Sequence, residues 1–197
     1  ESGPDGPVPG PDFILRFAAL MHDIGKPATR RFEGKKVTFH HHDVEGAKIT
    51  RKRMKALRFD KATTNAVAEL VAGHLRFHGY GDQAWTDSAV RRYVTDAGDQ
   101  LERLHRLTRA DVTTGNRRKA AHLAAAYDDL ELRIAELRKK EQLDSIRPEL
   151  DGEEIMAILN VGPSPAVGRA YKYLLSLRMD EGELGKEQAA ARLRQWW

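Results

Sequence analysis

The chain contains no cysteine. This absence excludes disulfide bonds and thiolate zinc sites, and it is compatible with a reducing compartment. No apolar run approaches the roughly 20 residues that a membrane-spanning helix needs. Residues 1–11 lack the basic and apolar regions of a signal peptide and are rich in Gly and Pro. We therefore interpret residues 1–11 as a linker, and we expect a cytoplasmic protein without a membrane partner. Because no initiator Met is present, we expect a fragment of a longer chain.

The charge of the chain is modest but unevenly distributed. Hydrophobic residues make up 41% and charged residues 31% of the 197 residues, which is typical of a helical protein with a large charged surface. The formal net charge is +4. Basic residues gather in two short segments, which are 51–58 and 117–119. Such segments suit a phosphate-bearing polyanion or, alternatively, form a solvated helix face.

The hydrophobic pattern predicts an all-α fold. Periodic apolar positions predict helices, several of them opened by Asp or Asn residues suited to N-caps. The expected helices span about 12–23, 43–57, 61–78 with Gly73 as a mild interruption, 86–97, 101–111, 116–141, 153–159, 166–179 and 186–197. Residues 31–39 are expected to form a small hairpin. We predict a helical domain over 12–141 and a small helical appendix over 142–197.

The first expected helix carries an apolar stripe and ends in two groups that can be charged. Its stripe consists of Phe13, Phe17, Leu20, Met21 and Ile24. His22 and Asp23 follow at the end of the helix, and Gly25 with Pro27 marks where the helix stops. Adjacent helical residues diverge by about 100°, so one ion can lie between His22 and Asp23 only near a helix end.

Three further residues complete the candidate site. His42 precedes a helix, whereas His74 and Asp111 lie at helical spacing from apolar residues. Ionisable groups on apolar stripes are costly to bury unless they are paired or bind metal. Imidazole and carboxylate ligands suit Mn, Fe, Ni, Co or Zn, and such an ion acidifies bound water and stabilises charge on a phosphoryl oxygen. A buried His–Asp contact that only holds helices together remains the alternative.

The neighbouring histidines are expected to lie elsewhere. We interpret His40 and His41 as surface residues, and we favour a surface role for His78. His78 follows His74 by four residues, so a chelating pair is the alternative.

The His22-Asp23 pair in its helix resembles the signature of the HD superfamily of metal-dependent phosphohydrolases, which are all-helical. The resemblance implies a divalent metal (Mg, Mn, Ni, Fe or Co) held by His22, Asp23, His42, His74 and Asp111, with His22 and Asp23 catalytic. Such proteins usually have an earlier helical His, but no His precedes His22. The resemblance therefore also predicts weak metal occupancy, because affinity depends on the number of ligands.

The ordered series of segments is similar to one family in particular. Residues 15–30, 39–47, 74–78 and 106–111 resemble bacterial CCA-adding tRNA nucleotidyltransferases of the poly(A) polymerase-like class. Segments 85–94, 150–156, 162–168 and 196–197 resemble actinobacterial members. The resemblance implies a C-terminal HD region that packs beside tRNA, with an HD-domain-like helical bundle as the fold.

The same resemblance implies two functions for this fragment. The transferase head of the family carries paired carboxylates on a strand and a Gly-Ser loop, and neither element is found here. The first expectation is an RNA-associated region, with Arg51, Lys52, Lys55 and Arg58 as phosphate contacts. The alternative is a metal-dependent HD phosphohydrolase that acts on a nucleotide phosphoester.

Overall fold

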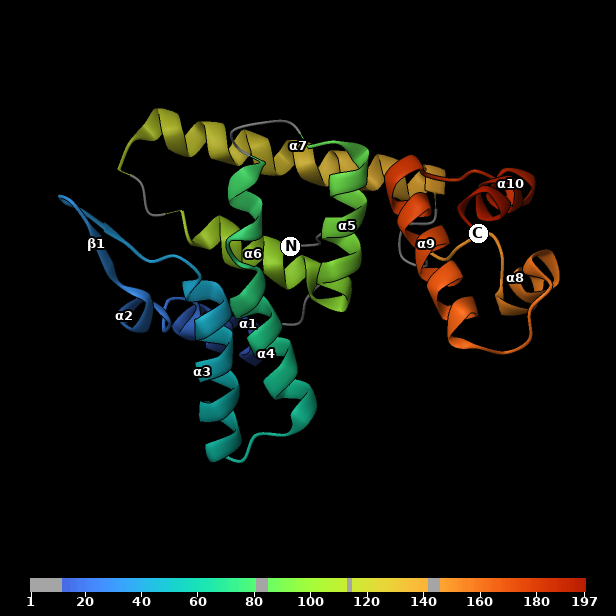
Figure 1. The fold of residues 1–197 in the computed structure, drawn as a ribbon. Coiled ribbons are helices and arrows are strands. Elements are labelled where there is room, and N and C mark those ends of the chain that lie inside the picture. Colours follow the sequence, from blue (N-terminus) through green and yellow to red (C-terminus); the bar gives the residue numbers. More distant parts are fainter. Residues whose placement is uncertain (1–11, 81–84, 113–114, 142–145) are drawn as a thin grey trace. The chain divides into compact units, whose positions relative to one another are not determined.

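The computed structural model describes residues 12–80, 85–112, 115–141 and 146–197. Its helices are α1 (Phe13–Met21), α2 (Lys26–Thr29), α3 (His42–Ala56), α4 (Lys61–Gly73), α5 (Asp87–Ala97), α6 (Leu101–Ala110), α7 (Arg117–Glu141), α8 (Gly152–Leu159), α9 (Pro165–Glu181) and α10 (Lys186–Trp196), with the 3-10 helices η1 (Arg76–Gly79) and η2 (Gly98–Gln100). Strands β1 (Arg31–Glu33) and β2 (Lys36–Thr38) form an antiparallel hairpin. The predicted all-α class and the hairpin are confirmed (Figure 1).

Among the described residues, no helix is long and apolar enough to cross a membrane. The predicted linker, residues 1–11, lies outside the described residues.

Helices α1, α4 and α8 begin at an Asp that caps the first turn. Asp12 accepts a hydrogen bond from the backbone of Leu15, and Asp60 accepts one from Thr63. At α8, Asp151 and Glu154 form a capping box in which each side chain satisfies a backbone N–H of the other. These caps satisfy amides that the first turn of a helix leaves without a partner, so the chain fixes helix starts locally.

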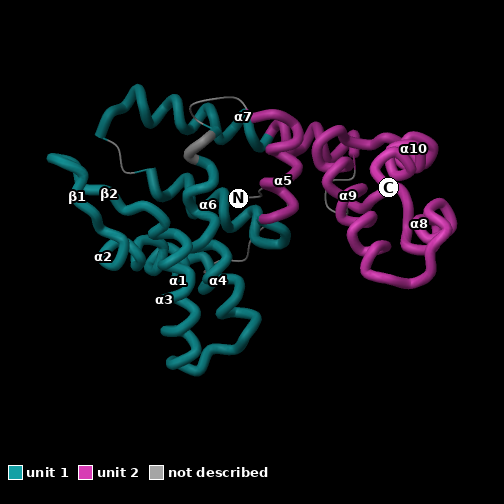
Figure 2. The backbone as a smooth tube through the Cα atoms, viewed as in Figure 1, with its two compact units in different colours: residues 1–84, 97–131 teal, residues 85–96, 132–197 magenta. Residues whose placement is uncertain are grey.

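The chain divides into two compact units, which Figure 2 colours separately. Unit 1 comprises residues 1–84 and 97–131, and unit 2 comprises residues 85–96 and 132–197. The unit boundary therefore falls inside α7, and α5 groups with the C-terminal helices. The division into domains at 141 and 142 expected from the sequence stays a prediction, because contact grouping does not test independent folding.

Unit 1 packs α1, α3, α4 and α6 around a small apolar cluster. Helix α4 contacts α3, α1 and α6, and α1 also contacts α6. The cluster consists of Met21, Ala47, Ala68 and Val71, with Phe17, Ile24 and Ala72 packed against it. Two of the four buried members are alanines, which leave room for the larger Met21 between the helices. The ends of α1 and α4 and the start of α3 are thereby brought together.

Part of the predicted stripe of α1 does not face the core. Leu20 is 74% exposed and Phe13 is 47% exposed, whereas Met21 is buried. The inward placement of Leu20 and Phe13 was therefore wrong. The helix is only nine residues long, and Phe13 stacks instead on Phe17 and Phe59 at the rim of unit 1.

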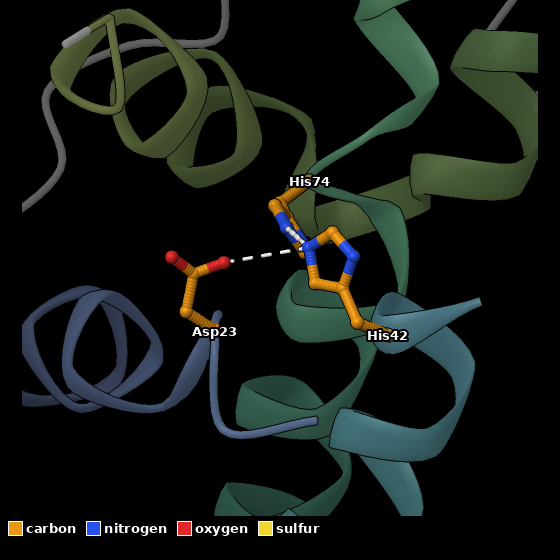
Figure 3. A group of neighbouring side chains, drawn as sticks. All are labelled: Asp23, His42 and His74. Carbon is orange, nitrogen blue, oxygen red and sulfur yellow. Dashed lines mark hydrogen bonds and ion pairs between the residues drawn. The ribbon is translucent and has the colours of Figure 1, made fainter. Parts of the chain in front are cut away.

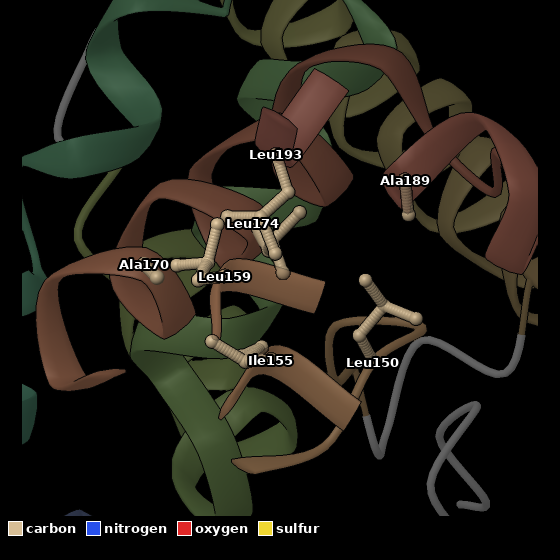
Figure 4. Packing of buried hydrophobic residues seen from close by; sticks show 7 residues of the cluster. All are labelled: Leu150, Ile155, Leu159, Ala170, Leu174, Ala189 and Leu193. Carbon is tan, nitrogen blue, oxygen red and sulfur yellow. The ribbon is translucent and has the colours of Figure 1, made fainter. Parts of the chain in front are cut away.

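Unit 2 has an apolar core built by α8, α9 and α10, which contact one another. Figure 4 shows this core from close by, and its buried members are Leu150, Ile155, Leu159, Ala170, Leu174, Ala189 and Leu193. Every one of them is an aliphatic side chain without a polar atom. The free energy of burial at this place is therefore hydrophobic.

Candidate metal centre

The candidate site lies where the ends of α1 and α4 meet the start of α3. His22 follows the last residue of α1, and Asp23 lies in the next turn. His42 is the first residue of α3, and His74 follows the last residue of α4. Asp111 follows the last residue of α6. Each candidate side chain thus sits at a helix end, where side chains from different helices can converge.

A close backbone contact brings Asp23 to His42. A Cβ atom on Gly25 would lie 2.1 Å from the carbonyl oxygen of His42 and 2.7 Å from the amide nitrogen of Gly46. Only glycine fits there, because either distance is shorter than any van der Waals contact. Gly25 therefore does more than end a helix: it lets the turn after α1 rest directly on α3.

The five candidate residues converge. Ligand atoms of Asp23, His42 and His74 all lie within 4.8 Å of one another, as Figure 3 shows. His42 Nε2 lies 3.3 Å from Asp23 Oδ1 and 3.3 Å from His74 Nε2. His22 Nε2 lies 3.1 Å from Asp111 Oδ1 and 3.5 Å from Asp23 Oδ2. Asp111 lies beside the His22-Asp23 corner although 89 residues separate it from His22.

Each histidine ring is oriented by the main chain. The Nδ1 atoms of His22, His42 and His74 lie 2.7, 2.8 and 2.6 Å from the carbonyl oxygens three residues earlier. A carbonyl oxygen only accepts, so Nδ1 carries the hydrogen and donates it. In a neutral ring Nε2 then carries a lone pair. All three rings therefore turn Nε2 toward the site in the tautomer that, when the ring is neutral, binds a metal through Nε2.

This donor set fits a divalent cation. His42 and His74 turn two lone pairs toward one another at 3.3 Å, and neither can donate to the other in this tautomer. Only a cation between them, either a proton or a metal ion, removes that repulsion. Metal–nitrogen bonds of about 2.0–2.1 Å place neighbouring ligand atoms about 3 Å apart, which is similar to the observed spacing. Imidazole and carboxylate ligands together suit a borderline divalent ion.

Burial and charge set the protonation of the site. Burial lowers the pKa of His74, which is 2% exposed, and positive charge on His22 and His42 lowers it further. The neutral ring that metal binding requires is thereby favoured. Burial raises the pKa of Asp23, but the hydrogen bond from Lys26 and the charges of Lys26, His22 and His42 lower it more, so the net shift is downward. Asp23 is accordingly held as a carboxylate.

Lys26 is a member of the site that the sequence reasoning missed. Its Nζ donates to Asp23 Oδ2 at 2.6 Å and lies 5.9 Å from the Phe39 ring centroid. The available signal was its position three residues after Asp23, on the turn that leaves α1. Lys26 places a fixed positive charge at the rim of the candidate centre.

The other histidines lie outside this group. His40 and His41 are exposed, as expected, and the side chain of His78 lies outside the described residues. His41 has a left-handed backbone with φ of 60°, which turns the chain into α3 directly before His42. Left-handed backbone is uncommon for residues other than glycine, so the local fold constrains this turn.

The expected RNA-contacting side chains lie away from this centre along α3. Arg51, Lys52 and Lys55 are on the later part of the helix and Arg58 follows it, and all are exposed. None of the four forms an ion pair with another described residue. At about 1.5 Å per residue, Arg51 is roughly 14 Å from His42 along the helix axis.

Comparison with known proteins places this arrangement in a family. The HD domain model matches residues 8–116, which contain all five candidate side chains. The chain belongs to the HD domain family. Proteins with HD domains typically bind divalent metals, which agrees with the donor set. The identity of the metal is not determined by these side chains.

Two curated relatives are similar over nearly the whole chain. A CC-adding tRNA nucleotidyltransferase of Thermus thermophilus is 38% identical over 187 residues, which are 92% of this chain and 39% of that protein. An A-adding tRNA nucleotidyltransferase of Deinococcus radiodurans is 31% identical over 191 residues, which are 96% of this chain and 43% of that protein. The predicted resemblance to tRNA nucleotidyltransferases is confirmed, while its actinobacterial detail stays a prediction. The chain spans about two fifths of the length of these relatives.

Proposed function

We propose that this chain is the C-terminal HD region of a cytoplasmic tRNA-maturing nucleotidyltransferase and that it contacts tRNA. The observation that carries the proposal is the identity to a CC-adding and an A-adding enzyme over more than nine tenths of the chain. The exposed cations Arg51, Lys52, Lys55 and Arg58, which form no ion pair with another described residue, support it, since phosphates are their natural partners. CC addition, A addition, CCA addition and poly(A) synthesis by the whole protein all remain compatible with this region.

A tRNA titration tests this proposal. Fluorescence anisotropy with labelled tRNA is expected to give an affinity that falls steeply with salt, because phosphate contacts release counterions. The double variant Arg51→Ala/Lys52→Ala should weaken binding and lower the salt slope by about 2. Lys139→Ala/Lys140→Ala, an exposed pair on α7, is the matched control. A salt-independent affinity, or equal losses in both double variants, would contradict the proposal.

A second candidate function is supported by the candidate metal centre. We propose that Asp23, His42 and His74 hold a divalent ion, with His22 and Asp111 completing the site, and that the region hydrolyses a nucleotide phosphoester. When bound, such an ion would stabilise charge on a phosphoryl oxygen and acidify water. The main-chain carbonyls that contact Nδ1 of His42 and His74 keep Nε2 of both rings aimed inward. Lys26 holds Asp23 ionised and adds positive charge at the rim, where an anionic substrate enters.

The hydrolase proposal has a direct test with an internal control. Isothermal titration with Mn²⁺, Ni²⁺ and Mg²⁺ is expected to show one site in the wild-type chain. Asp23→Asn should weaken that binding at least tenfold and abolish hydrolysis of a 2′,3′-cyclic nucleotide. His122→Ala changes an exposed histidine on α7 and should leave both unchanged. Metal binding without turnover would leave the centre a structural site.

A further inference from the structure

An exposed hairpin links the two halves of the candidate metal centre. Strands β1 and β2 pair Arg31 with Thr38, Phe32 with Val37 and Glu33 with Lys36. The hairpin follows the turn that carries Asp23 and precedes His42, and Figure 1 shows it projecting away from α2 and α3. Every residue of both strands except Thr38 is exposed. Two such short strands add little stability by themselves, so packing does not explain them.

The hairpin gathers cations that have no acidic partner. Arg30, Arg31, Lys35 and Lys36 are all exposed, and none forms an ion pair with another described residue. The single carboxylate here, Glu33, accepts from Thr38 and faces His40 at 3.6 Å. Four cations therefore face solvent beside one carboxylate, which favours an anionic partner.

An aromatic ring stands among these cations. Phe32 is 72% exposed and pairs across the hairpin with Val37, which is 46% exposed. The guanidinium carbon of Arg30 lies 5.4 Å from the centroid of the Phe32 ring. An exposed ring next to Arg and Lys is the combination with which proteins hold single-stranded nucleic acid, since the ring stacks on a base and the cations meet phosphates.

A cavity lies at the base of the hairpin. Its volume is about 400 Å³, and it is lined by Ala28, Thr29, Arg31, His40, His41 and Glu45. Arg31 belongs to both the hairpin and the cavity, and His41 directly precedes His42 of the candidate metal centre. The cavity offers guanidinium, imidazole and hydroxyl donors to a phosphate, while the carboxylate of Glu45 in the same lining can accept from a ribose hydroxyl.

We propose that the hairpin, residues 30–38, together with the cavity at its base, binds a single-stranded RNA segment and leads it toward the candidate metal centre. Phe32 stacks on a base, and Arg30, Arg31, Lys35 and Lys36 contact phosphates. Duplex RNA keeps its bases stacked and offers no free face to Phe32, so the single strand is the favoured form. A protein partner fits less well, because lysine is depleted in protein interfaces.

This inference rests on the proposed function in one respect: the proposed function makes RNA the polyanion that this region binds. It concerns a surface separate from the Arg51 to Arg58 segment of α3 and its following turn. The two can therefore fail independently, and one set of variants distinguishes them.

The test compares single-stranded RNA with duplex RNA on the intact chain. Fluorescence anisotropy is measured with a labelled RNA single strand of about 12 nucleotides and with its duplex, for the wild-type chain, Phe32→Ala and Lys35→Ala/Lys36→Ala. Phe32→Ala is expected to weaken single-strand binding about tenfold, because one base stack is lost. Duplex binding should weaken much less. Lys35→Ala/Lys36→Ala should lower the salt slope for the single strand by about 1.4.

Controls separate the local effect from loss of fold or net charge. Leu20→Ala removes another apolar side chain of unit 1 that is 74% exposed, and it should leave RNA affinity unchanged. Lys139→Ala/Lys140→Ala removes the same charge elsewhere and should have a smaller effect than the hairpin pair. Circular dichroism and Mn²⁺ titration check that the hairpin variants keep the fold and the candidate metal centre.

Three outcomes would overturn the inference. If both hairpin variants kept the RNA affinity of a wild-type chain that binds normally, the partner of the hairpin would be a protein and not RNA. Equal losses for single strand and duplex would replace base stacking with simple charge attraction. Absence of any RNA binding by the wild-type chain would remove both this inference and the proposed tRNA contact. If instead only Arg51→Ala/Lys52→Ala lost RNA affinity and the hairpin variants kept it, this inference alone would be removed.

Discussion

The interiors of the two units differ in what they bury. Unit 2 buries only aliphatic side chains in the cluster around Leu174, and its ion pairs, such as Arg91 with Glu141, lie outside that cluster. Unit 1 places His42 and His74, 8% and 2% exposed, beside a cluster of small apolar residues. The cluster around Leu174 is thus stabilised by hydrophobic burial alone, whereas unit 1 buries two imidazoles beside its apolar cluster.

This difference predicts separable responses to mutation. Burying an imidazole in place of an aliphatic side chain reduces stability unless its polar atoms are satisfied. A bound ion would satisfy the Nε2 atoms of unit 1, and its free energy of binding would add to the stability of the folded state. The substitutions below are ordered from the largest expected effect to the smallest.

Leu174→Ala should cause the largest loss of stability and leave metal binding intact. Leu174 is 1% exposed at the centre of the aliphatic core of unit 2, so truncation removes buried methyl groups and leaves a cavity. We expect the free energy of unfolding to fall by about 2–5 kcal/mol. Urea denaturation followed by circular dichroism measures it, and Leu132→Ala, which truncates a leucine 61% exposed, is the control. A parallel loss of Mn²⁺ affinity would contradict the separation of the two interiors.

Gly25→Ala should do the opposite, with a moderate loss of stability and a large loss of metal binding. The new methyl group would meet the carbonyl oxygen of His42, so the turn that carries Asp23 must move away from α3. We expect a loss of about 1–3 kcal/mol and an Mn²⁺ affinity at least tenfold weaker. Gly168→Ala, where nothing lies within 4 Å of the added Cβ, is the matched control. Retained Mn²⁺ affinity in Gly25→Ala would show that the glycine contact does not position Asp23.

The smallest expected effect concerns acid stability. The hydrogen bonds from Arg91 lower the pKa of Glu141, and burial opposes them only in part. A carboxyl group with a lowered folded pKa stabilises the protein above its unfolded pKa. That contribution is lost as the pH falls from near 4.5, the ordinary value for glutamate, through the lower folded pKa.

Glu141→Gln should therefore flatten the decline in stability below about pH 4.5, although the variant is less stable at neutral pH because Arg91 loses its partner. Urea midpoints between about pH 3 and 7 measure this decline. Glu153→Gln, an exposed glutamate on α8, serves as the control and should keep the wild-type slope. An unchanged slope in Glu141→Gln would assign the acid sensitivity to other carboxyl groups.

The sequence predicted what is decided locally. Asp12, Asp60 and Asp151 cap their helices because a cap needs only the next few residues. The candidate ligands were also named from the sequence, since an ionisable group at a helix end or on an apolar stripe is visible there. Their roles as metal ligands stay a prediction.

What the sequence did not reveal depends on how helices meet. Leu20 belongs to the apolar period of α1, but no helix covers it, and periodicity alone does not say how far a neighbour extends. The grouping of Asp23 with His42 and His74 arises from the backbone contact of Gly25 with α3, which involves no side-chain signal. Likewise, Lys26 joins the site only because the turn after α1 directs it there.

The partners that orient the three histidine rings are main-chain carbonyls of Ala19, Phe39 and Val71. Every amino acid carries such a carbonyl, so a substitution at any of these three positions that keeps the backbone in place also keeps the acceptor. The orientation of the three rings is therefore encoded in the path of the backbone and not in the identity of the neighbouring side chains.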